Sequence, residues 1–340
     1  MHFLITGHTG FKGTWLVHLL KSRGHTVSGY SLEQEKNSLF EISSAEALLE
    51  NHSIGDVRDF NNLEEFASKV NAEIIIHMAA QSLVRKSYRE PFLTYETNLI
   101  GTLNVLRAFR ERATTKCILI VTSDKVYENT IPNKIFTELD PLGGTDPYSA
   151  SKSTADIATK SWTSSFPGAT TVIARAGNVI GGGDICQDRL LPELITQYSA
   201  GVVPVLRYPN GVRPWQHVLD CLSGYLLLVQ KAALDKRLDG TAWNFGPAIH
   251  DHKKVHEVAE LVAKSLAPNL SWDLDQSSNP NESEALLLDS TKSITQLLWS
   301  TKFNVDEAIQ KTVNWHARKD RGESAISLIN SDINDFESKS

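Results

Sequence analysis

The sequence predicts an α/β fold: a doubly wound parallel sheet of the Rossmann type, with a smaller α/β lobe in the C-terminal half. Apolar runs predict strands at Met1–Thr6, His25–Tyr30, Ile74–Met78, Cys117–Thr122 and Thr171–Arg175. Helical patterns lie between them, as at Lys12–Lys21, Thr97–Arg110 and Ser149–Ser164. Strands that alternate with helices form parallel sheets through right-handed crossovers, so the strand C-termini should share one edge.

The first strand runs directly into a turn rich in glycine, with G-x-x-G-x-x-G spacing rather than the commoner G-x-G-x-x-G. Glycine permits the sharp turn into a helix, Gly10 would let a pyrophosphate approach the main chain, and Gly13 would let the helix pack closely. The helix N–H groups would face the phosphates. We therefore expect a dinucleotide site lined by Gly7, Thr9, Gly10, Phe11, Lys12 and Gly13.

The residues alone leave open which nicotinamide cofactor binds. NAD-specific sites usually carry an acid at the end of the second strand, about 20 residues after the glycines. That strand ends here in Val27-Ser28-Gly29-Tyr30-Ser31, with neither an acid nor an arginine that could meet a 2′-phosphate.

The pattern changes after Gly177. A glycine-rich loop at Gly181–Asp184 precedes a predicted helix at Leu190–Ser199, and the segment Gly211–Trp215 is expected to return toward the sheet. A helix at Val218–Ala233, a strand at Ala242–Gly246 and an amphipathic helix from His256 follow. We expect a dinucleotide-binding domain over 1–178 with returns near 206–248. A substrate lobe would take 179–205 and 249–318, and the polar segment 319–340 would fray.

Composition narrows the class of protein. The net charge of −6 argues against a broad nucleic-acid-binding surface. Three scattered cysteines indicate a reducing compartment, and the start of the chain resembles a core strand rather than a signal peptide, so we expect a cytoplasmic protein. There is no apolar run long enough to span a membrane. We expect no metal, because His250 and His252 lie in a charged turn without zinc-ligand spacing.

Tyr148 and Lys152 are four residues apart and should share one face of a helix. A tyrosine acts as a base near neutral pH only if its pKa falls from about 10, and a nearby cation favours the phenolate. Such a pair is also an ordinary helix face. The glycine turn and Ser123, at the end of a predicted strand, favour a catalytic role.

Together, the glycine turn, Ser123 and Tyr148-Ser149-Ala150-Ser151-Lys152 resemble the extended short-chain dehydrogenase/reductase family. Its nucleotide-sugar 4,6-dehydratases carry a charged pair after the Ser or Thr, usually in Thr-Asp-Glu. Ser123-Asp124-Lys125 departs from that pattern and is similar to the CDP-glucose subgroup, which has Asp-Lys. Further matching stretches run to about Trp315, among them RPWQHVLD at 213–220. The alternative for Asp124 and Lys125 is a solvated ion pair on a loop.

The resemblance implies NAD, a nucleotide-sugar substrate and a role for each residue of the motif. Ser123 would bond the 4-hydroxyl of the sugar, and Tyr148 would take its proton. Asp124 would protonate the departing 6-hydroxyl, and Lys125 would remove the C5 proton. Lys152 would hold the cofactor ribose. Deoxysugar biosynthesis for lipopolysaccharide O-antigen is the implied setting.

The resemblance also places the remaining contacts. Asp56 and Val57 would meet the adenine, Ala79, Ala80 and Gln81 would line the pyrophosphate and the substrate edge, and Asn98 would support the cofactor side of the site through backbone bonds. The candidates for the sugar nucleotide are Ser82, Arg85, Asn178, Arg189, Arg213 and Asn244, with Arg213 on the diphosphate. Arg213 could instead stack on Trp215.

The resemblance favours CDP-D-glucose as the substrate and CDP-4-keto-6-deoxy-D-glucose as the product. One alternative is a 4,6-dehydratase that acts on a GDP, dTDP or UDP sugar. A 4-epimerase would not need Asp124-Lys125, and a non-catalytic dinucleotide sensor would not need Tyr148 and Lys152. We expect a homodimer through a four-helix bundle of the Thr97–Arg110 and Ser149–Ser164 helices, because both carry extra apolar positions: Leu99, Leu103, Leu106, Ile157 and Trp162. The alternative is that these side chains face only their own sheet, and Thr102→Arg would separate the two.

Overall fold

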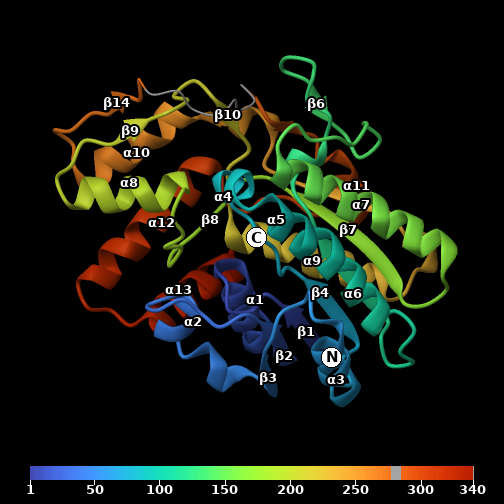
Figure 1. Ribbon diagram of the computed structural model, residues 1–340. Coiled ribbons are helices and arrows are strands. Elements are labelled where there is room, and N and C mark those ends of the chain that lie inside the picture. The colour runs from blue at the N-terminus through green and yellow to red at the C-terminus, as the bar shows by residue number, and fades with distance from the viewer. Residues whose placement is uncertain (277–284, 340) are drawn as a thin grey trace.

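The computed structural model describes residues 1–276 and 285–339. A parallel sheet in the order β12-β7-β5-β4-β1-β2-β3 forms its centre (Figure 1). The strands are β1 (His2–Thr6), β2 (Thr26–Ser31), β3 (Asn51–Ile54), β4 (Ile74–His77), β5 (Cys117–Val121), β7 (Thr170–Ala176) and β12 (Ala242–Phe245). The doubly wound parallel sheet predicted from the alternating pattern is confirmed, and the strand order reverses between β1 and β4.

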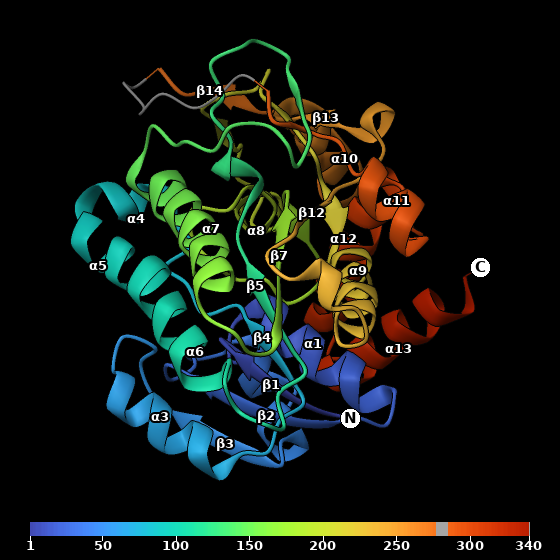
Figure 2. The same cartoon turned by 90° about the vertical axis from the view of Figure 1, so that its right-hand side faces the viewer.

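Helices cover both faces of the sheet (Figure 2). Phe3 and Ile5 of β1 pack with α1 (Phe11–Ser22), α9 (Val218–Ala232) and α13 (Ala325–Ser338). Leu4, which points the other way, packs with α3 (Phe60–Lys69) and α6 (Gly101–Phe109). Because successive side chains of a strand point to opposite faces, two buried faces require a continuous apolar run, as seen in β1 and β4.

The helix predicted at Thr97–Arg110 is part of a longer helical segment. It begins with α5 (Pro91–Tyr95), passes through a π-helical turn, η2 (Glu96–Ile100), and continues as α6. It packs beside α7 (Pro147–Ser165) on the outer face of the sheet (Figure 2). Single π-helical turns are common at functional sites, and this one carries Asn98.

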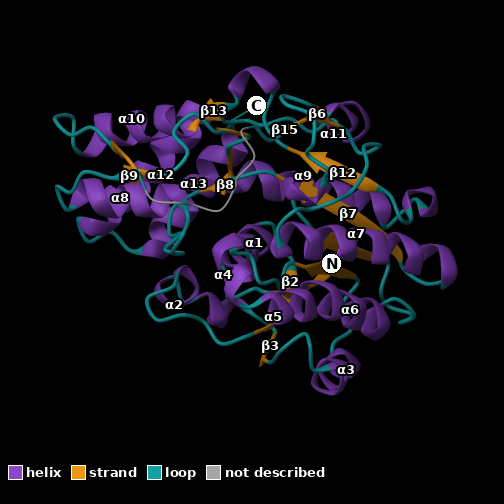
Figure 3. Ribbon diagram, turned by 45° about the horizontal axis from the view of Figure 1, so that its top comes forward, coloured by secondary structure: helices purple, strands orange, loops and turns teal. Residues whose placement is uncertain are grey.

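A second group of helices has its own apolar core (Figure 3). It contains α8 (Leu190–Ser199), α10 (Val255–Leu266) and α12 (Val305–Asp320). Their shared core supports the proposed substrate lobe, whose expected range includes 277–284, outside the described residues. The segment Gly211–Trp215, expected to return toward the sheet, adds no strand to it, although α9, which follows, packs on β5 and β7. β10 (Val212–Arg213) pairs with β13 (Lys253–Lys254), and the following β11 (Gln216–His217) pairs with β8 (Val179–Ile180).

The remaining strands and helices are short. Two further strand pairs are β9 (Val205–Leu206) with β14 (Asp273–Leu274), and β6 (Ile135–Phe136) with β15 (Leu287–Leu288). The remaining helices are α2 (Leu39–Ile42), α4 (Val84–Arg89), α11 (Thr291–Leu297) and the single turns η1 (Ala45–Leu48), η3 (Asp124–Val126), η4 (Lys236–Leu238) and η5 (Ile249–Asp251).

The expectation that 319–340 frays is wrong for the described part of that segment. Helix α13 lies beside α1 and buries Leu328, Ile329 and Phe336 in the main core. Arg23 at the end of α1 forms an ion pair with Glu337 at 2.6 Å. The apolar residues recur at helical spacing among the polar ones, and their small number concealed the amphipathic pattern.

Candidate active site

The predicted site residues gather at the carboxyl edge of the sheet. The glycine turn follows β1, Ala79-Ala80-Gln81 follows β4, and Ser123-Asp124-Lys125 follows β5. Helix α7 brings Tyr148 and Lys152 to the same place, where the Lys152 ammonium donates a hydrogen bond to the Val121 carbonyl at 3.0 Å. Open α/β sheets bind their ligands at this edge, next to the point where strand order reverses.

Ser123 organises the turn that carries the two charged residues. Its hydroxyl donates to Asp124 Oδ1 at 2.9 Å and accepts from the Lys125 N–H at 3.2 Å, which caps η3. Asp124 is 5% exposed, and its Oδ2 has no hydrogen-bond partner among the described residues. Asp124 is thus not half of a solvated surface ion pair.

The surroundings of Asp124 favour its protonated form. Burial raises the pKa of the carboxyl above its usual range, and the charge of Lys125, the bond from Ser123 and the charge of Arg213 oppose this only in part. A carboxyl whose pKa is raised keeps its proton to a higher pH, which suits a general acid.

Tyr148 and Lys152 are both buried and lie one helical turn apart on α7. Burial raises the pKa of Tyr148 to about 12, although its hydrogen bond with Ser123 opposes the rise. Burial, together with the charge of Lys12, lowers the pKa of Lys152 to about 7. Without the cofactor, desolvation of Tyr148 therefore outweighs the groups that favour the phenolate, and the joint effect of Lys152 and the nicotinamide stays a prediction.

The glycine turn has the shape of a phosphate cradle. Gly7 has φ +79°, and a Cβ at Gly7 would lie 2.7 Å from the Ala79 nitrogen. A Cβ at Gly13 would lie 2.2 Å from the Gly7 oxygen, so only glycine lets α1 start so close to β1. Gly10 precedes α1 and is exposed, and no side chain caps the helix. These uncapped N–H groups fit a dinucleotide pyrophosphate.

Two sets of side-chain hydrogen bonds fix the glycine turn and the loop after β4. Thr9 Oγ1 bonds Ser31 Oγ at 2.8 Å, which ties the turn to the end of β2. Asn98 accepts from the Gln81 N–H at 2.9 Å and donates to the Gln81 carbonyl at 3.0 Å and to Ser151 at 2.8 Å. Asn98 thus bonds the backbone of the loop after β4, as expected, and its role toward the cofactor stays a prediction.

The predicted adenine contacts lie beyond β3. Asp56 pairs with Arg58 at 2.6 Å, and the Tyr30 hydroxyl donates to the Asp56 carbonyl at 3.2 Å. Val57 is buried beneath Gly101, where a Cβ would lie 2.7 Å from Val57 Cγ2. Contact of Asp56 and Val57 with adenine stays a prediction.

Three of the candidate substrate residues, Ser82, Arg85 and Arg189, lie together in one cluster of polar contacts. Arg189 pairs with Asp184 at 2.9 Å and donates to Ser82 at 3.3 Å, and Arg85 pairs with Asp188 at 3.2 Å. One cluster therefore joins the loop after β4 to the loop before α8. Sequence reasoning did not assign Asp184 and Asp188 a role, although both follow the glycine-rich loop.

Two further candidates lie beside this cluster. Arg213 is buried, and its charge acts on Asp124, which places it at the site. The Asn178 carbonyl accepts from the Gln216 N–H at 2.9 Å, and the Asn178 side chain is half-buried. Contact of either residue with a sugar nucleotide stays a prediction.

The assignment of Asn244 to the substrate is wrong. Its side chain has no exposed surface, its Nδ2 donates to the carbonyls of Phe136 and Asp289, and its Oδ1 accepts from the Tyr127 hydroxyl at 2.6 Å. Asn244 lies at the carboxyl edge of β12, as expected, but its amide group is occupied by hydrogen bonds within the protein.

Sequence reasoning missed Tyr225, whose ring lies beside one of the predicted cofactor residues. The ammonium of Lys12 lies 5.8 Å from the centre of the Tyr225 ring. The Tyr225 hydroxyl is buried and has no hydrogen-bond partner among the described residues. Burial raises the pKa of this hydroxyl well above its usual value. Tyr225 lies in an apolar helix pattern, so no sequence signal indicated its place.

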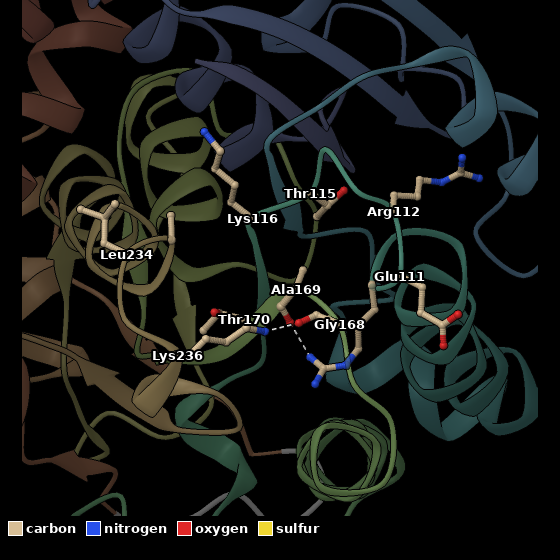
Figure 4. A pocket seen from close by; sticks show the side chains of 11 residues that line it. Glu111, Arg112, Thr115, Lys116, Gly168, Ala169, Thr170, Leu234 and Lys236 are labelled. Atoms are coloured by element: carbon tan, nitrogen blue, oxygen red, sulfur yellow. Dashed lines mark hydrogen bonds between the residues drawn. The ribbon is translucent and has the colours of Figure 1, made fainter.

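A pocket of about 320 Å³ lies elsewhere, beside the starts of β5 and β7 (Figure 4). Its basic side chains already have partners: Arg112 pairs with Glu64 and Lys116 with Glu73, at 2.6 and 2.7 Å. It lies at the amino edge of the sheet, opposite Ser123, so it is not the site described above. Among the described residues there is no group of three His, Cys, Asp or Glu placed to hold a metal ion, and no helix long and apolar enough to cross a membrane.

Comparisons with known proteins identify the family of this chain. The family model described as GDP-mannose 4,6 dehydratase matches residues 4–312. A CDP-glucose 4,6-dehydratase of Salmonella typhimurium is 38% identical over 98% of this chain and 95% of the relative. The chain therefore belongs to the GDP-mannose 4,6-dehydratase family, which confirms the predicted resemblance and the enzyme class.

More distant relatives share the fold. A dTDP-glucose 4,6-dehydratase from Bacillus anthracis, solved in complex with NAD, superposes with a TM-score of 0.80 over 97% of this chain and 99% of that one, at 22% identity. A UDP-glucose 4-epimerase of Pisum sativum is 26% identical over 92% of this chain and 94% of the relative. The fold thus serves both reactions, and the site must distinguish them.

Proposed function

We propose that this protein is an NAD-dependent dehydratase that converts CDP-D-glucose into CDP-4-keto-6-deoxy-D-glucose. The proposal rests mainly on Asp124. Its buried carboxyl has a raised pKa, accepts a hydrogen bond from Ser123 and lies next to Lys125 and Tyr148. The identity with a CDP-glucose 4,6-dehydratase over nearly the whole chain supports the choice of nucleotide.

The protein's residues fit the cofactor. The glycine turn and the uncapped start of α1 would hold the pyrophosphate, and Lys152 would hold the ribose hydroxyls. NAD, held by these residues, would supply the hydride acceptor for C4 of the sugar and the hydride donor for C6, and its nicotinamide would add positive charge to the site. That charge favours the phenolate, which the residues around Tyr148 alone do not.

The side chains divide the remaining steps. Tyr148 accepts the proton of the 4-hydroxyl while Ser123 holds that hydroxyl, which leaves a ketone at C4. The ketone makes the C5 proton acidic, and Lys125, as the neutral amine, would take that proton and become an ammonium. Asp124 gives its proton to the 6-hydroxyl, which leaves as water and forms the C5–C6 double bond. A proton then returns to C5 as the hydride returns to C6.

The acid distinguishes this reaction from a 4-epimerisation. An epimerase of this fold oxidises and reduces the same carbon, and it needs no proton donor for a leaving hydroxyl. A buried Asp124 with Oδ2 unbonded by the described residues would serve no purpose in that reaction. The intact Tyr148 and Lys152 likewise argue against a non-catalytic sensor.

A panel of CDP-, dTDP-, GDP- and UDP-hexoses tests the proposal. The purified protein with NAD should convert CDP-glucose into a product lighter by one water, and should convert the others more slowly. Loss of water from another nucleotide sugar in preference would correct the base. Water loss from none of them would contradict the function.

The proposal includes a homodimer through α5, α6 and α7. Phe92, Ile100 and Ile157 on these helices are 84%, 44% and 51% exposed. Such apolar groups on neighbouring helices support a docking face between two copies. Leu106 is fully buried in the subunit core, so it does not belong to this face. Thr102 is 2% exposed and bonds His77, so Thr102→Arg would disrupt the interior and cannot test the dimer.

The proposal also covers the cellular location of the enzyme and the pathway that its product enters. A cytoplasmic enzyme is supported by three cysteines that form no disulfide with one another. Supply of a deoxysugar for lipopolysaccharide O-antigen rests on the family resemblance.

A further inference from the structure

We infer that Asp156, Arg175 and Tyr127 form a buried positioning network that holds the acid–base turn, Asp124–Lys125, in register with the helix that carries Tyr148. None of the three would touch the substrate, and the network lies behind the site. The inference rests on the proposed dehydration, because it assigns the network to one step of that reaction.

The first link joins α7 to the sheet. Asp156 lies one helical turn after Lys152 and two after Tyr148, on the same side of α7. Its carboxylate accepts from Arg175 Nε at 2.8 Å and from Nη2 at 2.9 Å, and neither side chain is exposed. This two-point contact fixes the position of α7 along β7.

The second link joins Arg175 to the acid–base turn. Arg175 Nη1 donates to the Tyr127 hydroxyl at 2.9 Å, and that hydroxyl donates to Asn244 Oδ1 at 2.6 Å. The Tyr127 ring stacks on Phe136 with centroids 4.9 Å apart and planes at 10°. Burial raises the pKa of Tyr127, so the hydroxyl stays protonated and can donate. Tyr127 follows η3 directly, so its ring anchors the end of the Asp124–Val126 turn.

A third contact holds the same turn from α7. Ser153 follows Lys152, and its Oγ lies 2.8 Å from the carbonyl oxygens of Val126 and Ser149 and 2.9 Å from that of Gly143. Its single proton is shared among the three. The turn is thus tied to α7 through Ser153, and to β7 and β12 through Tyr127.

Energetics favour a positioning role over stability alone. A buried ion pair costs so much desolvation that apolar residues of the same size often stabilise a protein as well or better. What the pair supplies here is a fixed geometry among three segments: α7 with Tyr148, η3 with Asp124, and β12 through Asn244. Hydrogen bonds linked in series also strengthen one another in a low-dielectric interior.

The network does not hold the two catalytic groups equally. Tyr148 lies in a helix of 19 residues with many contacts of its own, whereas Asp124 lies in a turn of three residues. Loss of the Tyr127 hydroxyl should therefore displace Asp124 and Lys125 before it displaces Tyr148. Oxidation at C4 would continue, while loss of water would slow.

Tyr127→Phe tests this in the full-length enzyme with NAD and CDP-glucose. Rapid mixing under single-turnover conditions follows the absorbance of reduced nicotinamide. We expect its formation to stay within about twofold of wild type and its disappearance to slow by about tenfold or more, because small misplacements cost rate steeply. Reduced cofactor would then accumulate. If both phases slow equally, or neither changes, the network has no positioning role and the inference is wrong.

Two further variants complete the design. Tyr198→Phe is the matched control, since it also removes a buried hydroxyl, which bonds the Ser271 carbonyl at 3.2 Å in the second lobe. It should leave both phases unchanged. Ser153→Ala loosens the same turn from α7 and should repeat the Tyr127→Phe pattern; unchanged kinetics there would also contradict the inference. If wild-type enzyme releases no water from any nucleotide hexose, the proposed function fails instead.

Discussion

Burial raises the pKa of both acids, to about 12 for Tyr148 and above its usual range for Asp124. Tyr148 therefore needs added positive charge nearby to accept a proton, whereas a raised pKa suits Asp124 to give one. We therefore assign the two groups to separate steps of the proposed reaction.

Removing only the phenolic oxygen tests the first step. Tyr148→Phe should lower the rate of cofactor reduction by about 10²–10⁴, the usual value of general-base help. Binding of NAD, measured by ligand titration, should stay within a few-fold of wild type. A variant that keeps more than half of the wild-type turnover would remove Tyr148 from the mechanism.

Asp124→Asn tests the second step, because a carboxamide cannot give up a proton to a leaving hydroxyl. We expect cofactor reduction in a single turnover at near the wild-type rate, followed by a stalled 4-keto-hexose and lasting absorbance of reduced nicotinamide. The acid role would be excluded if the variant failed to reduce the cofactor while still binding it, or if it released dehydrated product normally.

At the scale of helices and strands, the sequence predicted the elements that a local residue pattern determines. Continuous apolar runs located β1, β4, β5 and β7, because strands buried on both faces leave little room for polar residues. Strand β3 was missed, since Asn51-His52-Ser53 reads as polar and lies at the sheet edge. The glycine turn and α7 were placed correctly because their chemistry is local.

What depends on tertiary packing could not be predicted. Asn244 was assigned to the substrate, yet long-range bonds to Tyr127 and Phe136 use its amide. Lys12 and Tyr225 meet only after α1 and α9 pack side by side. Desolvation of Tyr148 likewise depends on the folded environment and not on the Tyr-x-x-x-Lys spacing.

Helix α13 gives a prediction at the same scale. Phe336 is 1% exposed and packs edge-on to Phe303 at 5.7 Å. Phe336→Ala should lower the free energy of unfolding by about 3 kcal/mol or more, as usual for a buried phenylalanine. Denaturant titration measures this, with the exposed Leu298→Ala as control. A loss below about 0.5 kcal/mol, within the range of surface substitutions, would mean that this helix adds nothing to the core.

At the scale of the whole molecule, the two parts divide the work. In the proposed enzyme the sheet and its glycine turn would present one edge to the cofactor. The α8–α10–α12 group lies beside that edge, joined to it by the contacts of Arg189 with Ser82 and of Arg85 with Asp188. The predicted dimer would place α5, α6 and α7 against a second copy, on a different face from α13 (Figure 2).

Ile157→Arg tests that assembly. A charge at the centre of an apolar helix interface should convert the dimer to a monomer at micromolar concentration, as measured by light scattering. Ile326→Arg, at a comparably exposed isoleucine on α13, should leave the dimer intact. A wild-type monomer, or a dimer that tolerates Ile157→Arg, would mean that this face does not form the contact.

The most direct test of the account follows one hydrogen atom through the reaction. CDP-glucose carrying deuterium at C4 is converted by the enzyme with NAD, and the product is analysed by mass and NMR spectroscopy. We predict loss of one water and transfer of the deuterium from C4 to C6, because the hydride that Tyr148 helps to release from C4 returns only after Asp124 has expelled the 6-hydroxyl. Deuterium that returns to C4 without loss of water would show an epimerase and contradict the account.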